Sequence, residues 1–226
     1  KKMVCVAPND IPAVAIVDPE LMYSMPKGLT AATGMDALTH AIESYITPGA
    51  WVMSDMFELK AIEMIAQNLK AAVDNGKDVA AREAMSQAQY IAGMGFSNVG
   101  LGIVHSMAHP LGAFYDTPHG VANALLLPYV MEYNAESPAA PKYIHIAKAM
   151  GVDTTGMSEA EGVKAAVEAV KALSASINIP QKLHEINVKE EDIPALAVAA
   201  FNDVCTGGNP RPTSVADIEA LYRKAF

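Results

Sequence analysis

Three of the six histidines of the chain lie in one short stretch, GIVHSMAHPLGAFYDTPHG. They are His105, His109 and His119. His105 and His109 are four residues apart, the spacing that places two side chains on one face of a helix. Asp36 and His40, in GMDALTHAIESYI, have the same spacing. A carboxylate and several imidazoles brought together in this way can chelate a divalent ion.

This donor set favours a catalytic metal site over a structural one. It contains no thiolate, which excludes a closed, Cys-rich zinc site. One Asp with two or three His leaves a coordination position open for a substrate oxygen. The same ligands suit Fe²⁺ and Zn²⁺. Taken singly, any one of these histidines is better explained as a hydrogen-bonded core residue. An isolated Asp–His pair is better explained as part of a solvated helix face. The histidine-rich stretch and the Asp–His pair together favour a metal site.

A bend is predicted within the histidine-rich stretch. Pro110 and Gly112 indicate a break between two helical segments. Thr117 and Pro118 indicate an N-cap followed by proline at the first helical position. The bend would turn His119 back toward the preceding helical segment.

The fold class predicted for the chain is mainly α. Val- and Ile-rich residues at 3–7 and 13–17 indicate two short strands, so we expect residues 1–27 to be an α/β remnant and residues 28–226 to be one all-helical domain. Apolar residues spaced three and four apart, and two Ser-x-x-Glu/Asp capping boxes, indicate the helices. Their predicted ranges are 30–46, 51–73, 80–100, 118–134, 139–150, 158–177, 189–204 and 214–224.

Composition narrows the function classes. The net charge is −9 and the basic residues are scattered, which argues against a nucleic-acid partner. No apolar run is long enough for a membrane span. The two cysteines, Cys5 and Cys205, lie far apart in the sequence, which favours a reducing compartment such as the cytoplasm over a disulfide framework.

Residues near the histidines could form a substrate pocket. Phe96, Phe114 and Tyr115 could wall a small apolar cavity, and the side-chain amide of Asn98 could face it or serve a turn or cap. The Gly- and Pro-rich loop CTGGNPR is either a surface turn or one edge of an active site.

Two long motifs resemble the signatures of the iron-dependent (group III) alcohol dehydrogenases. GMDALTHAIESY resembles the first signature, GMGFSNVGLGIVHSMAHPLGAFYDTPHGVANALLLP resembles the second, and DVCTGGNPR is also similar. The similarity covers essentially the whole chain. It implies that Asp36, His40, His105 and His119 are the metal ligands. It implies that His109 lies near the nicotinamide and is not a ligand.

The same resemblance implies an NAD-linked oxidoreductase that interconverts a short primary alcohol or diol, such as 1,2-propanediol, and its aldehyde at Fe²⁺. Zn²⁺ and NADP are the alternatives for the two cofactors. His109 is then the expected catalytic residue, passing the released proton to solvent. The expected cofactor contacts are His109, Lys2, Leu21 and Met25, and the expected assembly is a homodimer.

The cofactor domain of that family is expected to be mostly missing from this chain. The sequence has no GGGS-type phosphate loop and no G-x-G-x-x-G motif after a strand. One alternative is therefore a helical metal-binding fragment that is inactive by itself. Another is a helical metal-dependent phosphohydrolase, but these use an adjacent His-Asp pair. No His here is followed by Asp, and residues 88–141 contain no Lys or Arg for a phosphate.

Overall fold

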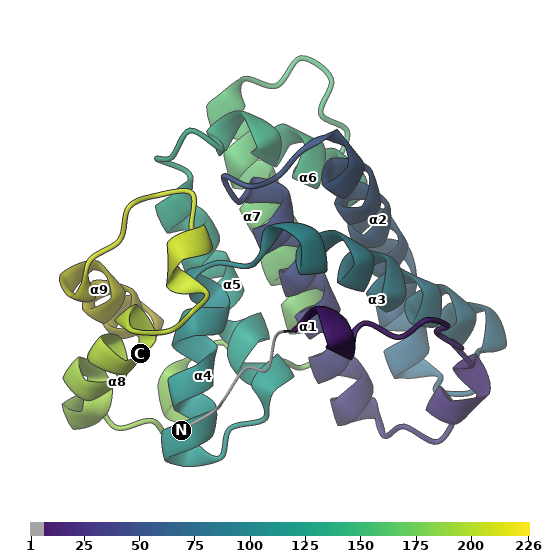
Figure 1. Ribbon diagram of the computed structural model, residues 1–226, viewed down its shortest axis with the longest axis horizontal. Helices are drawn as coiled ribbons and strands as arrows, with labels where there is room; N and C mark the ends of the chain where they lie inside the picture. Colours follow the sequence, from purple (N-terminus) through teal and green to yellow (C-terminus); the bar gives the residue numbers. More distant parts are fainter. Residues whose placement is uncertain (1–6) are drawn as a thin grey trace.

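The computed structural model describes residues 7–226. These residues form nine α-helices joined by loops and 3₁₀ turns: α1 (Lys27–Ile46), α2 (Val52–Asp74), α3 (Val79–Val99), α4 (Ile103–Tyr115), α5 (His119–Asn134), α6 (Tyr143–Ala149), α7 (Glu159–Ser176), α8 (Ile193–Phe201) and α9 (Val215–Ala225). Figure 1 shows α1 near the centre, packed by α2 and α3 on one side and by α5 on the other. Helix α4 packs on α5, and α8 and α9 lie beyond them.

Helix α1 is buried over most of its length. Between Thr30 and Ile46, every residue is buried except Thr33, Asp36 and His40. Their spacing of three and four residues places these side chains on one stripe of the helix. The rest of its surface packs against neighbouring helices, so the stripe is held in a fixed direction.

A buried arginine fixes the segment that leads into α1. The side chain of Arg82, on α3, is fully buried. Its guanidinium donates hydrogen bonds to the carbonyl oxygens of Gly76 (2.9 Å) and Met25 (3.1 Å) and to Oγ1 of Thr30 (2.8 Å). Since buried donors are costly to leave unpaired, these three bonds hold α1 and its preceding segment against α3.

The predicted bend at Pro110 and Gly112 is wrong in position. Helix α4 continues through Pro110 to Tyr115, and the chain reverses at Asp116, which has a left-handed backbone (φ 54°). A proline removes one helical hydrogen bond, but residues 103–111 are all buried. Packing of this segment outweighs the local cost of the proline.

The start of α5 also differs by one residue from its prediction. Pro118 occupies the N-cap position and His119 is the first helical residue, with no side-chain hydrogen bond at the cap. The first turn of α5 lies directly on α1, since a Cβ added to Gly120 would be 2.3 Å from the carbonyl oxygen of Ala32. This close approach brings His119 next to the exposed stripe of α1.

The two predicted strands are not found among the described residues. Residues 3–6 lie outside them, and residues 13–17 have no strand structure. A strand needs a neighbour for its backbone hydrogen bonds, and residues 7–226 contain no strand to pair with. Val14 and Ile16 are instead 76% and 88% exposed.

Most predicted helices are confirmed to within a few residues. The capping boxes at Ser158 and Ser214 are both present and open α7 and α9. The predicted helix 189–204 is shorter, since a 3₁₀ turn (Glu190–Asp192) precedes α8, which ends at Phe201. Within the described part of the chain, no helix combines the length and apolar character needed to cross a bilayer.

Candidate metal centre

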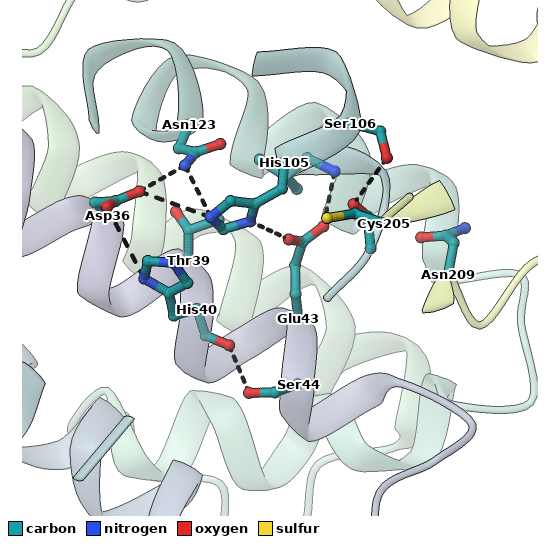
Figure 2. A network of polar contacts seen from close by, with 12 residues as sticks. Asp36, Thr39, His40, Glu43, Ser44, His105, Ser106, Asn123, Cys205 and Asn209 are labelled. Carbon is teal, nitrogen blue, oxygen red and sulfur yellow. Dashed lines mark hydrogen bonds and ion pairs between the residues drawn. The ribbon is translucent and has the colours of Figure 1, made fainter. Parts of the chain in front are cut away.

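The four residues predicted to bind a metal come together where α1, α4 and α5 meet. Asp36, His40 and His105 offer donor atoms that all lie within 4.8 Å of one another. Oδ1 of Asp36 is 3.8 Å from Nε2 of His105 and 3.6 Å from Nε2 of His119, and its Oδ2 is 3.9 Å from Nδ1 of His40. Figure 2 shows Asp36 and His40 from α1 facing His105 from α4.

A second carboxylate fixes the ring of His105. Oε2 of Glu43 accepts the Nδ1–H of His105 at 2.5 Å, and its Oε1 accepts the backbone N–H of Val104 at 2.7 Å. Glu43 and His105 are both almost fully buried. With the proton on Nδ1, the lone pair of Nε2 points toward Asp36. This carboxylate–histidine arrangement is typical of a metal-binding imidazole.

The side-chain amide of Asn123, one turn after His119 on α5, lies at the centre of the cluster. Its Nδ2 is 2.5 Å from Oδ1 of Asp36 and 3.1 Å from Nε2 of both His105 and His119. One amide carries two hydrogens, so it cannot satisfy three acceptors. Oδ1 of Asn123 is buried and has no hydrogen-bond partner within residues 7–226.

The charges of the cluster suit cation binding. Burial raises the pKa of Asp36, but the neighbouring imidazoles and the amide of Asn123 lower it more, so the net shift is downward. Burial lowers the pKa of His40 to about 4, and the ring of His105 adds to this effect. At neutral pH the site therefore presents a carboxylate and a neutral imidazole, the forms in which both bind metals.

His109 lies beside this cluster and has a partner of its own. Its Nδ1 donates to Oδ2 of Asp203 at 2.8 Å, and its ring stacks on that of His119 with centroids 5.3 Å apart. Asp203 also accepts the backbone N–H of Cys205 at 3.0 Å. Burial raises the pKa of Asp203, but the hydrogen bonds from His109 and Cys205 outweigh it and the net shift is downward.

A cavity of about 470 Å³ opens onto Asp36 and His40. Phe96 lines it and stacks on His40, with ring centroids 4.5 Å apart. Met25, an expected cofactor contact, also lines it. Leu21, in the 3₁₀ turn Pro19–Met22, is 80% exposed and is not part of the cavity wall.

Other predicted site residues lie elsewhere. Lys2 lies outside the described residues. Phe114 and Tyr115 do not line the cavity, which corrects the predicted apolar wall: Phe114 is 53% exposed, and the hydroxyl of Tyr115 donates to Asp192. Tyr115 is the last residue of α4, and its hydroxyl contacts the 3₁₀ turn Glu190–Asp192 that precedes α8. The side-chain amide of Asn98 donates to the carbonyl oxygen of Met94 within α3, so it has a local structural role and not a place in the pocket.

The loop CTGGNPR reaches the site and is not a free surface turn. Oγ1 of Thr206 is hydrogen-bonded to Oγ of Ser106 on α4 at 2.8 Å. A Cβ added to Gly208 would lie 1.9 Å from the carbonyl oxygen of Leu101, so only glycine fits this approach. Asn209 pairs with Asn134 through two hydrogen bonds of 2.8 Å. The loop thereby holds Asp203 against His109.

Sequence reasoning missed Glu43, Asn123 and Asp203. Two of them carried a local signal: Glu43 follows His40 by three residues, and Asn123 follows His119 by four, so each shares a helix face with a predicted ligand. Asp203 carried no such signal, since it is 94 residues away from His109 in the sequence. Only the packing of the loop after α8 on α4 brings these two together.

Similarity to known proteins extends over most of the chain. The family model described as "Fe-containing alcohol dehydrogenase family, C-terminal" matches residues 30–226, which is most of the chain. The chain belongs to the Fe-containing alcohol dehydrogenase family. The all-helical fold and the resemblance in the two signatures are thereby confirmed.

Individual members of the Fe-containing alcohol dehydrogenase family match the whole chain. Lactaldehyde reductase of Escherichia coli K12 is 59% identical over 226 residues, and NAD-dependent methanol dehydrogenase of Bacillus methanolicus is 45% identical over 225. The crystal structure of a 1,3-propanediol oxidoreductase superimposes with a TM-score of 0.91 at 47% identity over 92% of the chain. The chain spans only 58%, 59% and 55% of the lengths of these three proteins.

The residues at the centre fit the ion for which the family is named. Nε2 of His105 and Oδ1 of Asp36 both present lone pairs to the same space, and Glu43 keeps the proton of His105 on the other nitrogen. The amide of Asn123 donates into this space but has only two hydrogens for three acceptors, so the acceptors repel one another unless a cation lies near them. An imidazole and carboxylate set without thiolate suits Fe²⁺ and also Zn²⁺.

Proposed function

We propose that this chain is the metal-binding part of an NAD-linked oxidoreductase that interconverts a short primary alcohol or diol and its aldehyde. Lactaldehyde and 1,2-propanediol are the proposed substrate pair, supported by the 59% identity to a lactaldehyde reductase. Asp36, His40, His105 and His119 are the proposed ligands of Fe²⁺. The observation that carries the proposal is the orientation of His105, whose Nδ1–H is held by Glu43 while Nε2 faces Asp36.

When bound, the ion supplies Lewis acidity toward the substrate oxygen and the nicotinamide supplies or takes up the hydride. The protein side chains do the remaining work. Phe96, stacked on His40, limits the space beside the ligands and so favours a short substrate. His109, held through Nδ1 by Asp203, keeps Nε2 as the atom that can take up the alcohol proton and release it to solvent.

The cofactor site is proposed to lie between this domain and a dinucleotide-binding domain that precedes it in the whole enzyme. Residues 1–27 would then be the end of that domain, with Lys2, Leu21 and Met25 near the cofactor. The exposed apolar side chains of Val14, Ile16 and Leu21 support this, since exposed apolar residues gathered in one segment suit a surface that another domain covers. NAD is proposed over NADP because a 45% identical relative is an NAD-dependent methanol dehydrogenase.

A homodimer in the cytoplasm is proposed for the whole enzyme. The scarcity of cysteine, two in 226 residues, supports a reducing compartment. Sedimentation of the whole enzyme tests the assembly, with the dimer expected and a monomer contradicting it.

The test of activity is NADH oxidation with lactaldehyde, measured on the whole enzyme purified without oxygen and loaded with Fe²⁺. We expect turnover that disappears on chelation and returns with Fe²⁺. Loss of dependence on any metal would contradict the proposal.

The 226-residue chain measured alone gives the matched comparison. We expect it to bind the ion and to show no NADH-linked turnover. Turnover by the chain alone would contradict the proposed division between a cofactor domain and this metal-binding domain.

A further inference from the structure

A second group of metal-binding side chains lies next to the proposed iron site. His109 on α4 and Asp203 and Cys205 in the loop after α8 offer donor atoms that all lie within 4.8 Å of one another. None of the three is among the proposed iron ligands. The side chains of His109 and Asp203 are only 9% and 15% exposed, and Cys205 is partly buried.

The loop geometry holds this group in place. Asp203 accepts the Nδ1–H of His109 at 2.8 Å and the backbone N–H of Cys205 at 3.0 Å. Thr206, the next residue, bonds both Ser106 on α4 and the carbonyl oxygen of Ala200 on α8, each at 2.8 Å. The three donors therefore start from fixed positions, and binding an ion requires little ordering of the chain.

The chemistry of the three donors differs from that of the iron site. The iron site offers a carboxylate and imidazoles, whereas this group adds a thiol. Thiolate, imidazole and carboxylate together are the ligands that Zn²⁺ takes in proteins, and thiolate selects softer ions. Three protein ligands leave a fourth position for water.

We propose that His109, Asp203 and Cys205 form a second metal site that binds a zinc-like divalent cation. Binding expels the thiol proton of Cys205 to solvent and moves the imidazole proton of His109 from Nδ1 to Nε2. The carboxylate and the thiolate then neutralise the two charges of the ion. The occupied site ties the loop after α8 to α4.

Occupancy has a consequence for activity that rests on the proposed function. An ion on Nδ1 of His109 leaves a proton on Nε2, so the ring cannot accept the alcohol proton there. Excess Zn²⁺ is therefore expected to inhibit the whole enzyme reversibly without displacing Fe²⁺.

The test uses Co²⁺ as a spectroscopic substitute for Zn²⁺, because a cobalt–thiolate bond gives a near-ultraviolet charge-transfer band that imidazole and carboxylate ligands do not give. The whole enzyme carries Asp36→Ala, which removes a ligand of the iron site. We expect Co²⁺ to produce the band and added Zn²⁺ to abolish it. Addition of Cys205→Ser should remove the band and about one equivalent of bound cobalt per chain, since the site then loses one of three ligands.

Cys5→Ser is the matched control and should keep the band. Asp203→Asn tests the carboxylate ligand and should weaken cobalt binding at least tenfold, with circular dichroism showing that the variant is folded. A band that persists in Cys205→Ser, that is lost in Cys5→Ser, or that never forms would overturn the second site. The cobalt band and the cobalt affinity do not depend on alcohol oxidation. Failure of the proposed function would appear only in the NADH assay, so the two proposals can fail separately.

Discussion

The two ring nitrogens of His105 have different partners, and this difference defines the site at the residue scale. Nδ1 donates to Glu43 and Nε2 faces Asp36. His109 has the same kind of partner at Nδ1, the carboxylate of Asp203, but among the described residues its ring stacks on His119 and is not paired with Asp36. Two histidines one helical turn apart therefore have different expected roles, ligand and proton carrier.

Substitution of single histidines should separate these roles. We expect His105→Ala and His119→Ala to lose the bound ion, because each removes one of four ligands. His109→Ala should keep the ion and lower turnover by about 10²- to 10⁴-fold, the usual contribution of a general acid or base. Plasma emission measures the metal content of the whole enzyme. Metal content near wild type in His119→Ala, or metal loss in His109→Ala, would show that the ligands are misassigned.

Glu43 should control metal affinity without touching the ion. In Glu43→Gln the carboxylate that orients His105 becomes a neutral amide, and loss of such a partner typically weakens metal binding about 10- to 100-fold. Competition with a chelator measures the affinity. Glu159→Gln, at the exposed start of α7, is the control and should leave the affinity unchanged. Equal affinity in Glu43→Gln and wild type would remove Glu43 from the metal site.

The close contact of α1 with α5 positions the ligands at the element scale. Gly120→Ala would place a methyl group 2.3 Å from the backbone oxygen of Ala32, so the two helices must move apart. We expect a loss of about 1–3 kcal/mol in the free energy of unfolding, as for other overpacked sites, together with weaker metal binding. Chemical denaturation measures the first effect and chelator competition the second.

Gly93→Ala is the matched control within the helices, because a Cβ there meets nothing within 4 Å. Alanine is the better helix former by about 1 kcal/mol, so this variant should be as stable as wild type or more stable. A Gly120→Ala enzyme as stable as the Gly93→Ala enzyme would mean that α1 and α5 are not in close contact.

The contact between α1 and α2 contains a carboxyl group that must be protonated. Oγ of Ser44 is 2.5 Å from both the carbonyl oxygen of His40 and Oε1 of Glu58. A hydroxyl has one hydrogen and a carbonyl only accepts, so Glu58 supplies the proton of the second bond. Burial raises the pKa of Glu58 to about 8.

Stability should therefore fall as the pH rises. The unfolded chain releases the proton of Glu58 near its ordinary pKa of 4.5, whereas the folded protein keeps it up to about 8. Between these values the unfolded state binds fewer protons, so the free energy of unfolding decreases with pH. Glu58→Gln should flatten this part of the curve in thermal unfolding of the whole enzyme, and Glu159→Gln should not. Parallel curves for Glu58→Gln and wild type would contradict a protonated Glu58.

Local sequence patterns could predict most helices because helix period and caps are local properties. The capping boxes at Ser158 and Ser214 mark α7 and α9 correctly. The bend predicted at Pro110 was wrong because a proline acts on local backbone hydrogen bonding. The burial of α4 depends on distant helices and outweighs that local effect. The strand at residues 13–17 was wrong because a strand depends on a partner that the described residues do not contain.

The site could be predicted in part, because the spacing of residues within one helix is also a local property. Spacing of four residues found Asp36 with His40 and His105 with His109, but spacing cannot say which nitrogen of a ring is protonated. That property depends on Glu43 and Asp203, which are 62 and 94 residues away from the histidines they contact. Contacts over such separations follow from packing, which a periodic pattern does not contain.

At the scale of the whole molecule, the helices form a scaffold around one polar centre. Helix α1 contributes Asp36 and His40, α4 contributes His105, and α5 contributes His119, so the centre exists only when the three helices pack together. The cavity of about 470 Å³ gives access to it from one side. Binding of an ion to the folded form alone would therefore also stabilise the fold.

The most direct test is the anomalous scattering of iron in crystals of the whole enzyme, grown without oxygen in the presence of Fe²⁺. We expect one strong peak at the iron edge, bounded by Asp36, His40, His105 and His119. The peak should be absent from crystals of the His119→Ala enzyme. A well-ordered site with no peak at the iron edge, or a peak that touches none of these four side chains, would contradict the account.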